Sequence, residues 1–317
     1  MIVNRLLETT MPTHLKFHPG ERSVQRKAGE AGIADRNSAM ISDSIVGGAI
    51  RFIEDQHMVV VASIDGMGGV WPSVLYGDAG FASAESTQSV TIRIPRSHRD
   101  ASDPLWQNLD SHSSVGLLFI ELGSRRRYRI NGQLIRNNDE EIEISVTEAY
   151  PNCPKYIQRR QLKKFEDGFA GREVLTGTAL DNNIDTIVQQ ADTMFVASNN
   201  AATGADASHR GGNPGFMRIV DAHTLLVPDY NGNGMFNTLG NIELDPRTGL
   251  CIPDFAGQRL LQLTGRASLL WNQDDPQNHT GGTGRFLRFD IDRWILRPVS
   301  QHLEWEYIDA SPYNLPA

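Results

Sequence analysis

The chain carries an internal repeat with a separation of about 133 residues. Four residue pairs share this offset: Pro95 with Pro228, Asn108 with Asn241, Gly116 with Gly249, and Gly132 with Gly265. Further upstream the offset changes by only two residues, where 62–63 matches 197–198. A constant separation over many positions indicates a repeated structural unit. The sequence therefore predicts two copies of one fold. The alternative is two unrelated β-rich halves whose glycines coincide.

Each copy has the same predicted order of elements. A helix with one apolar face comes first, and a short, continuously apolar strand follows, as expected for a strand buried on both faces. A second strand, a third strand that ends at a proline, a short helix and long strands complete the copy. The predicted elements are helices at 41–52 and 180–191, strands at 58–64 and 193–198, strands at 71–77 and 205–211, strands at 90–95 and 223–228, short helices at 103–110 and 236–244, and long strands at 141–150 and 285–296. Many strands with short connections favour a small barrel in each copy, and hence a mainly β protein with a few short helices.

The repeat also predicts how the chain is divided. We expect an N-terminal arm over residues 1–37 that contributes no core element, because this stretch is polar and contains several glycines. The first copy is assigned to 38–154 and the second to 179–317. Between them, the basic segment 155–178 is predicted to be a joint that starts as a helix.

Composition excludes several classes of protein. The 317 residues carry a net charge of −8, which gives no reason to expect a nucleic-acid partner. Two cysteines cannot form a disulfide framework, and the nine histidines show no metal-ligand spacing, so no metal site is expected. The N-terminus lacks the pattern of a signal peptide, and no apolar run approaches the ~18 residues of a membrane helix. We therefore expect a soluble, cytoplasmic protein without a membrane partner.

Three sequence segments resemble a known family. Residues 205–250 contain a polar strand with Ser208 and Arg210, a Gly-Phe turn, a strand ending in Pro-Asp, a loop rich in glycine and asparagine, and a short helix. Residues 152–160 contain a Cys-x-Lys…Arg segment, and 17–29 are similar to the opening of a subgroup. Together they resemble the FMN-binding split β-barrels related to pyridoxamine 5′-phosphate oxidase, over about 17–310. True oxidase activity on pyridoxamine phosphate is not expected, because the arginine- and lysine-rich phosphate motifs of that enzyme are not recognisable.

The resemblance implies a flavin site shared by two barrels. Members of this family dimerise, and each flavin lies in a groove to which both subunits contribute. Here two tandem split barrels could form that dimer within one chain, as an intrachain pseudo-dimer. Because the phosphate-loop signature lies only in the second copy and the Cys-x-Lys tail only in the first, we predict one competent groove per chain.

The candidate cofactor-binding residues all suit a phosphate group. Arginine offers a planar fork of donors, asparagine and glycine turns direct backbone N–H groups outward, and a helix N-terminus favours an anion. Lys155 and Arg159 are four residues apart and would share one face of the predicted helix. The candidates are Lys155, Arg159, Ser208, Arg210, Asn231, Asn233, Asn237 and Thr238. For each of them the alternative is an ordinary turn or a solvated surface, and the basic stretches 93–99 and 124–129 are interpreted as surface.

The leading functional hypothesis is an FMN-dependent oxidoreductase acting on an unknown small substrate, in which the cofactor carries the redox chemistry. The first alternative is a flavin-binding or electron-carrying protein without a substrate of its own. A second alternative is a related barrel that binds deazaflavin or haem, and a third is a scaffold that binds nothing. No catalytic residues can be identified from the sequence, and a homodimer of such chains is possible.

Overall fold

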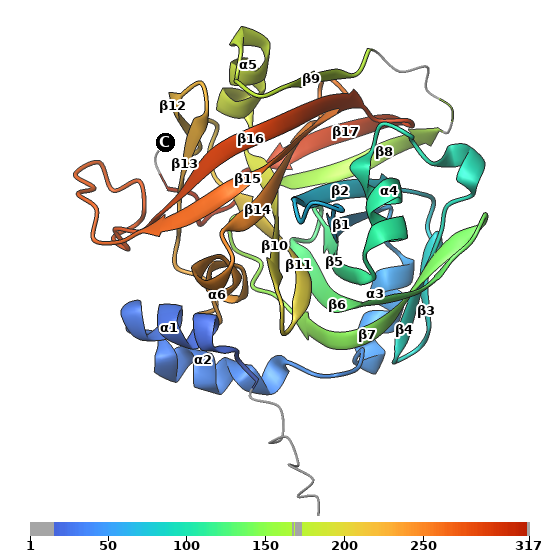
Figure 1. The fold of residues 1–317 in the computed structure, drawn as a ribbon, viewed down its shortest axis with the longest axis horizontal. Coiled ribbons are helices and arrows are strands. Elements are labelled where there is room, and N and C mark those ends of the chain that lie inside the picture. The colour runs from blue at the N-terminus through green and yellow to red at the C-terminus, as the bar shows by residue number, and fades with distance from the viewer. Residues whose placement is uncertain (1–15, 167, 169–172, 316–317) are drawn as a thin grey trace, which may run out of the picture.

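The structure, a computed structural model, describes residues 16–166, 168 and 173–315 and consists mainly of β-strands (Figure 1). Its core is two tandem split β-barrels. The first barrel contains α3 (Gly47–Glu54), β1 (Met58–Ile64), β2 (Val70–Tyr76), β3 (Ala82–Ser86), β4 (Ser89–Arg93), α4 (Pro104–Ser111), β5 (Ser114–Glu121), β6 (Arg126–Asn137) and β7 (Glu141–Pro151). The second contains α5 (Asn182–Gln190), β10 (Thr193–Asn200), β11 (Gly204–Gly211), β12 (Arg218–Asp221), β13 (Thr224–Pro228), α6 (Asn237–Leu244), β14 (Arg247–Asp254), β15 (Arg259–Leu270) and β16 (Phe286–Pro298).

The two barrels have the same strand order. The sheet of the first runs β2-β1-β5-β6-β7-β4-β3, and that of the second runs β11-β10-β14-β15-β16-β13-β12. A short strand, β9 (Leu175–Gly177), adds to β16. After each barrel comes one more strand, β8 (Arg159–Glu166) or β17 (His302–Asp309), and these two pair with each other. The chain thus joins its two copies by a sheet to which each contributes one strand.

The repeated residues occupy matching places in the two sheets. Ala62 lies opposite Gly116 in the first barrel, and Ala197 lies opposite Gly249 in the second. Each barrel also has an irregularity in register immediately before its next matched glycine, Gly132 or Gly265. The offset that is visible in the sequence therefore corresponds to the same position in the same strand.

The apolar strands are buried on both faces because the barrels pack on each other. In β1, Val59 and Val61 belong to the core of the first barrel, whereas Val60 and Ala62 belong to a separate apolar cluster between the barrels. In β10, Met194 and Val196 face the second barrel's core, and Phe195 and Ala197 join the same cluster. The continuous apolar run of each strand is thereby explained, since one face fills a barrel and the other fills the interface.

The interface requires glycine at two of the matched positions. A Cβ atom on Gly116 would lie 2.7 Å from the carbonyl oxygen of Ala205 and the Cα of Asp206, in the opposite barrel. A Cβ atom on Gly249 would lie 2.4 Å from the carbonyl oxygen of Val70. Both values are below any normal carbon contact, so the strands can approach this closely only without a side chain.

Three predicted features differ from the structure. The helix predicted at 41–52 forms only over α3, because Ile41 and Ile45 precede it in extended and turn segments. The joint does not start as a helix, since residues 155–156 form a turn and β8 follows at Arg159. Strands β3 and β12 were not predicted, because both are short and polar on one face.

The N-terminal segment also differs from the predicted arm. Residues 19–27 form α1 (Pro19–Lys27) and residues 31–37 form α2 (Ala31–Asn37), followed by a short 3-10 turn, η1 (Ser38–Met40). A second such turn, η2 (Arg96–His98), precedes α4. Helix α1 packs on α6 beneath the second barrel (Figure 1), and its Val24 is part of that barrel's core. The expectation for residues 1–15 lies outside the described residues. Among the described residues, no helix has the length and apolar character that a bilayer crossing requires.

We predict that Gly116→Ala lowers the free energy of unfolding by about 1–3 kcal/mol, because the added methyl group must displace the backbone of the opposite barrel. The measurement is urea denaturation followed by tryptophan fluorescence. Gly48→Ala in α3 is the matched control: its Cβ would meet nothing within 4 Å, so stability should stay the same or rise. Equal effects of the two substitutions would contradict the close approach.

Candidate functional site

A cleft opens where the first barrel meets the second. The first barrel contributes Arg127 and Arg129 from β6 and residues 152–156 that follow β7. The second contributes the end of β11, the loop 229–236 and the first residues of α6. The cleft encloses about 750 Å³, open solvent at its mouth included. It therefore depends on both copies, because neither barrel supplies all of its walls.

The walls carry four cationic side chains: Arg127, Arg129, Lys155 and Arg210. Arg129 forms a buried ion pair with Asp206, at 3.0 Å. Arg127 instead donates to two carbonyl oxygens, those of Cys153 at 2.7 Å and His209 at 3.3 Å. Among the described residues, no carboxylate forms an ion pair with Arg127 or Lys155. Two of the four charges are thus left without an anionic partner.

The remaining cation of the walls, Arg210, is only weakly paired with a carboxylate. Its guanidinium lies 4.0 Å from Asp229, and that carboxylate is already bound by Arg285 at 2.9 Å. Burial lowers the pKa of Arg210, and burial together with Arg129 and Arg210 lowers the pKa of Arg127 to about 9. Burial is the larger cause of both shifts, and repulsion between the neighbouring arginines adds to it. An anion in the cleft would relieve that repulsion.

The N-terminus of α6 faces the same cleft. Its N-cap, Phe236, has a left-handed backbone (φ 60°) and provides no side-chain cap. The first backbone N–H groups of the helix, from Asn237 to Leu239, therefore lie at the cleft without a capping oxygen from residue 236. Uncapped N–H groups and the positive end of the helix dipole favour an anion. Together with Arg127, Lys155 and Arg210 they form what we call the anion cradle.

The structure brings five of the eight predicted residues into the lining of this cleft: Lys155, Arg210, Asn233, Asn237 and Thr238. Ser208 lies directly behind them, fully buried, with its hydroxyl 2.9 Å from that of Thr238. Asn231 presents its backbone carbonyl to the Tyr156 hydroxyl at 3.0 Å. Lys155 and Arg210 therefore lie in one cleft although they come from different copies.

Arg159 is not in the lining. It lies on β8, half-exposed, and its guanidinium is bound to both oxygens of Asp309. The prediction that it shares a helix face with Lys155 is wrong, because this segment passes from a turn directly into a strand. In a strand, residues four apart are separated by about 13 Å.

Arg127 and Arg129 were missed, because the basic stretch 124–129 was interpreted as surface. Their neighbours Tyr128 and Ile130 fill the core of the first barrel, so the alternating arginines must point to the interface. The internal repeat could have indicated that these two arginines are buried. The matching positions in the second copy are Leu260 and Gln262, which are buried. A position that is buried in one copy is a candidate for burial in the other.

A neutral histidine and an aromatic group complete the cleft. His209 is buried, and within the described part of the chain neither ring nitrogen has a hydrogen-bond partner. Burial and the nearby Arg127 and Arg210 hold its pKa well below the usual range, so the imidazole is uncharged at neutral pH. Tyr230 also lines the cleft, with its ring 4.7 Å from that of Tyr156. The lining thus contains aromatic surface as well as cations.

The matching place on the other side of the pseudo-dimer is filled by the protein's own charges. There Asp103 takes the position of Phe236, and it caps α4 by accepting from Leu105 N–H at 3.0 Å. The same carboxylate is bound by the buried guanidinium of Arg297. Leu75 stands where the cradle has Arg210. An internal aspartate thus occupies the place that the anion cradle leaves open.

Comparison with known proteins adds only structural likeness. No protein-family model matches the sequence. A search of curated proteins also finds no match.

A candidate pyridoxamine 5′-phosphate oxidase from Lactobacillus delbrueckii is 12% identical, with 39% of this chain and 98% of that chain covered and a TM-score of 0.31. An FAD-binding protein from Mesorhizobium loti is 13% identical, with 40% and 99% covered and a TM-score of 0.29. HutZ, the haem storage protein of Vibrio cholerae, is 11% identical, with 43% and 99% covered and a TM-score of 0.26. The chain is therefore similar in structure, at low identity, to these three proteins, and each of them corresponds to less than half of its length.

Proposed function

We propose that the anion cradle binds the phosphate of FMN and that the protein is an FMN-dependent oxidoreductase. The observation that carries this proposal is the gathering of three cations at an uncapped helix N-terminus: Arg127 and Lys155, which form no ion pair with a carboxylate of the described residues, and the weakly paired Arg210. A phosphate monoester has close to two negative charges and needs this combination of forks and fixed N–H donors. The sequence resemblance supplies the identity of the cofactor.

The remaining residues fit the other parts of a flavin. The ribityl chain is polyhydroxylated and would find donors and acceptors in Asn152 and Asn233, which also line the cleft. The rings of Tyr156 and Tyr230, 4.7 Å apart and tilted by 37°, provide aromatic surface in the lining of the cleft. When bound, flavin supplies hydride and electron transfer, and this would explain why the cleft contains no recognisable set of catalytic side chains. His209, uncharged between two arginines, would add no charge of its own to the site.

The first test is the identity of the bound molecule. The protein is purified without added cofactor and denatured, and the released molecule is identified by its absorbance and mass. Release of FMN would support the proposal. Release of haem or a deazaflavin would contradict it and would support the alternative that this barrel binds one of those cofactors. Turnover of an added acceptor with NADH or NADPH would then distinguish an oxidoreductase from a flavin carrier.

We predict that Arg127→Gln and Arg210→Gln each weaken FMN binding about 10- to 100-fold, because each removes a charge-assisted hydrogen bond to phosphate. Affinity is measured by quenching of flavin fluorescence, with circular dichroism to confirm that the variants fold. Arg159→Gln is the control, since Arg159 binds Asp309 outside the cleft and its loss should leave the affinity unchanged. Unchanged affinity in both cradle variants would rule out the cradle as the phosphate site.

We also predict one FMN per chain. The pseudo-symmetric position is occupied by Asp103 and Arg297, so a second phosphate would have to displace a buried ion pair. The ratio is obtained from flavin absorbance and protein concentration after saturation and removal of free ligand. Two flavins per chain would contradict the filled second position.

A further inference from the structure

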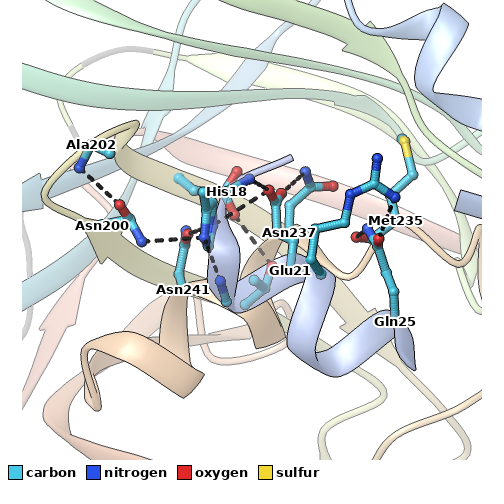
Figure 2. Close-up of polar contacts among 12 residues, drawn as sticks. His18, Glu21, Gln25, Asn200, Ala202, Met235, Asn237 and Asn241 are labelled. Carbon is cyan, nitrogen blue, oxygen red and sulfur yellow. Dashed lines mark hydrogen bonds and ion pairs between the residues drawn. The ribbon is translucent and has the colours of Figure 1, made fainter. Parts of the chain in front are cut away.

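The N-terminal segment contacts the anion cradle through α6 and the loop that precedes this helix. Figure 2 shows the side chains of His18, Glu21 and Gln25 directed at residues of α6 and of the loop that precedes it. The contacts are His18 to the Asn241 side chain at 2.9 Å, Glu21 to the Asn237 side chain at 2.5 Å, Gln25 to the Met235 carbonyl at 2.9 Å, and, further on, Asn37 to the Asn233 carbonyl at 2.6 Å. Two of the bonded residues, Asn233 and Asn237, line the cleft.

Two glycines allow α1 to reach this position. A Cβ atom on Gly20 would lie 2.1 Å from the carbonyl oxygen of Gly240, and one on Gly240 would lie 2.5 Å from the backbone nitrogen of Glu21. The helices therefore touch backbone to backbone. This close approach carries the carboxyl group of Glu21 to the first residue of α6, at the edge of the cradle.

Glu21 is a buried carboxyl group with two hydrogen-bond partners. One oxygen accepts from the backbone N–H of His18 at 2.7 Å, and the other lies 2.5 Å from the amide nitrogen of Asn237. The titratable groups around it are the His18 ring at 3.5 Å and the carboxylates of Glu148 and Asp206. Burial raises the pKa of Glu21 to about 8, and the two carboxylates add to the effect of burial. At neutral pH the group is therefore largely protonated.

The protonation state of Glu21 determines which end of the Asn237 side-chain amide can face the cleft. An ionised Glu21 can only accept, so Asn237 donates its Nδ2 to Glu21 and leaves Oδ1, for which the described residues provide no donor, to the cleft. A protonated Glu21 still accepts from His18 but can donate its O–H to Oδ1. The amide then turns over, and its N–H groups face the cleft.

We propose that Glu21 is a positioning residue of the anion cradle, and that its proton turns Asn237 from an acceptor into a donor toward the bound anion. The inference rests on the proposed function, since it concerns the same cradle. Its consequence for binding has a definite sign. An anion binds better to the form that presents N–H groups, so binding favours protonated Glu21, and affinity falls as pH rises past the pKa of this group.

The test compares wild type with Glu21→Gln. The glutamine can accept from His18 with its oxygen and donate to Asn237 with its nitrogen, so it imitates the protonated state at every pH. Glu243→Gln is the matched control, because Glu243 lies in the same contact between α1 and α6 but binds Lys27 and Ser23 instead of Asn237. The side-chain amide signal of Asn237 is followed by ¹H–¹⁵N NMR between about pH 6.5 and about pH 9.5, without ligand.

Anion affinity is measured over the same range, first with inorganic sulfate, which stays a dianion throughout, and then with FMN. We expect the Asn237 signal to titrate in wild type and Glu243→Gln and to remain constant in Glu21→Gln. Sulfate affinity of the wild type should fall about tenfold more than that of Glu21→Gln, the loss expected for one charge-assisted hydrogen bond. Any loss common to both proteins belongs to other groups near the cleft that titrate in this range, such as Arg127 and Glu148.

The outcomes separate the two proposals. An Asn237 signal that does not titrate, or equal pH profiles of sulfate affinity in wild type and Glu21→Gln, overturns the role of Glu21. Sulfate binding with the expected profiles, but without any FMN binding, supports the role of Glu21 and overturns the flavin proposal instead.

Discussion

The close packing of one barrel's strands on the backbone of the other is the constraint on which the rest of the structure depends. Gly116 lies against Ala205 and Asp206, and Gly249 lies against Val70 at the matching place. These contacts bring β6 beside β11, and only then can Arg129 pair with Asp206 across the interface. Because a buried ion pair is costly to break, any shift of the barrels that separated Arg129 from Asp206 would be destabilising. The cleft is a product of that alignment.

Two copies of one fold have acquired opposite electrostatics at matching positions. In the cradle, the helix N-terminus is uncapped, and Arg127 and Lys155 form no ion pair within the described part of the chain, so in our proposal the negative charge comes from a ligand. On the other side, Asp103 supplies the negative charge and Arg297 balances it. The physical requirement at a helix N-terminus is the same in both cases, and it is met once by the protein and once, in our proposal, by a ligand. Symmetry of the backbone therefore does not produce symmetry of charge.

Much of the fold could be predicted from local patterns. The apolar strands, the prolines that end β4 and β13, and the short helices before β5 and β14 all follow from period, propensity and turn residues. Five of the eight candidate residues line one cleft, four of them from the contiguous segment 210–238 and Lys155 from the first copy. The N-terminal helices were missed, since α1 is mostly polar and becomes stable only by packing on α6. Arg127 and Arg129 were missed because arginines at alternate positions of a strand are typical of a solvent-exposed face.

The sequence by itself determined the repeat and the barrel architecture, because the periodicity and turn residues of each element are local and recur at a constant offset. Only the tertiary structure decided which charges are compensated. Whether an arginine is paired depends on what lies within about 4 Å of it, and those neighbours come from distant segments: Asp206 for Arg129, Asp309 for Arg159, and for Arg127 no carboxylate among the described residues. A one-dimensional pattern can place charges along a strand, but ion pairing is a property of distances in space.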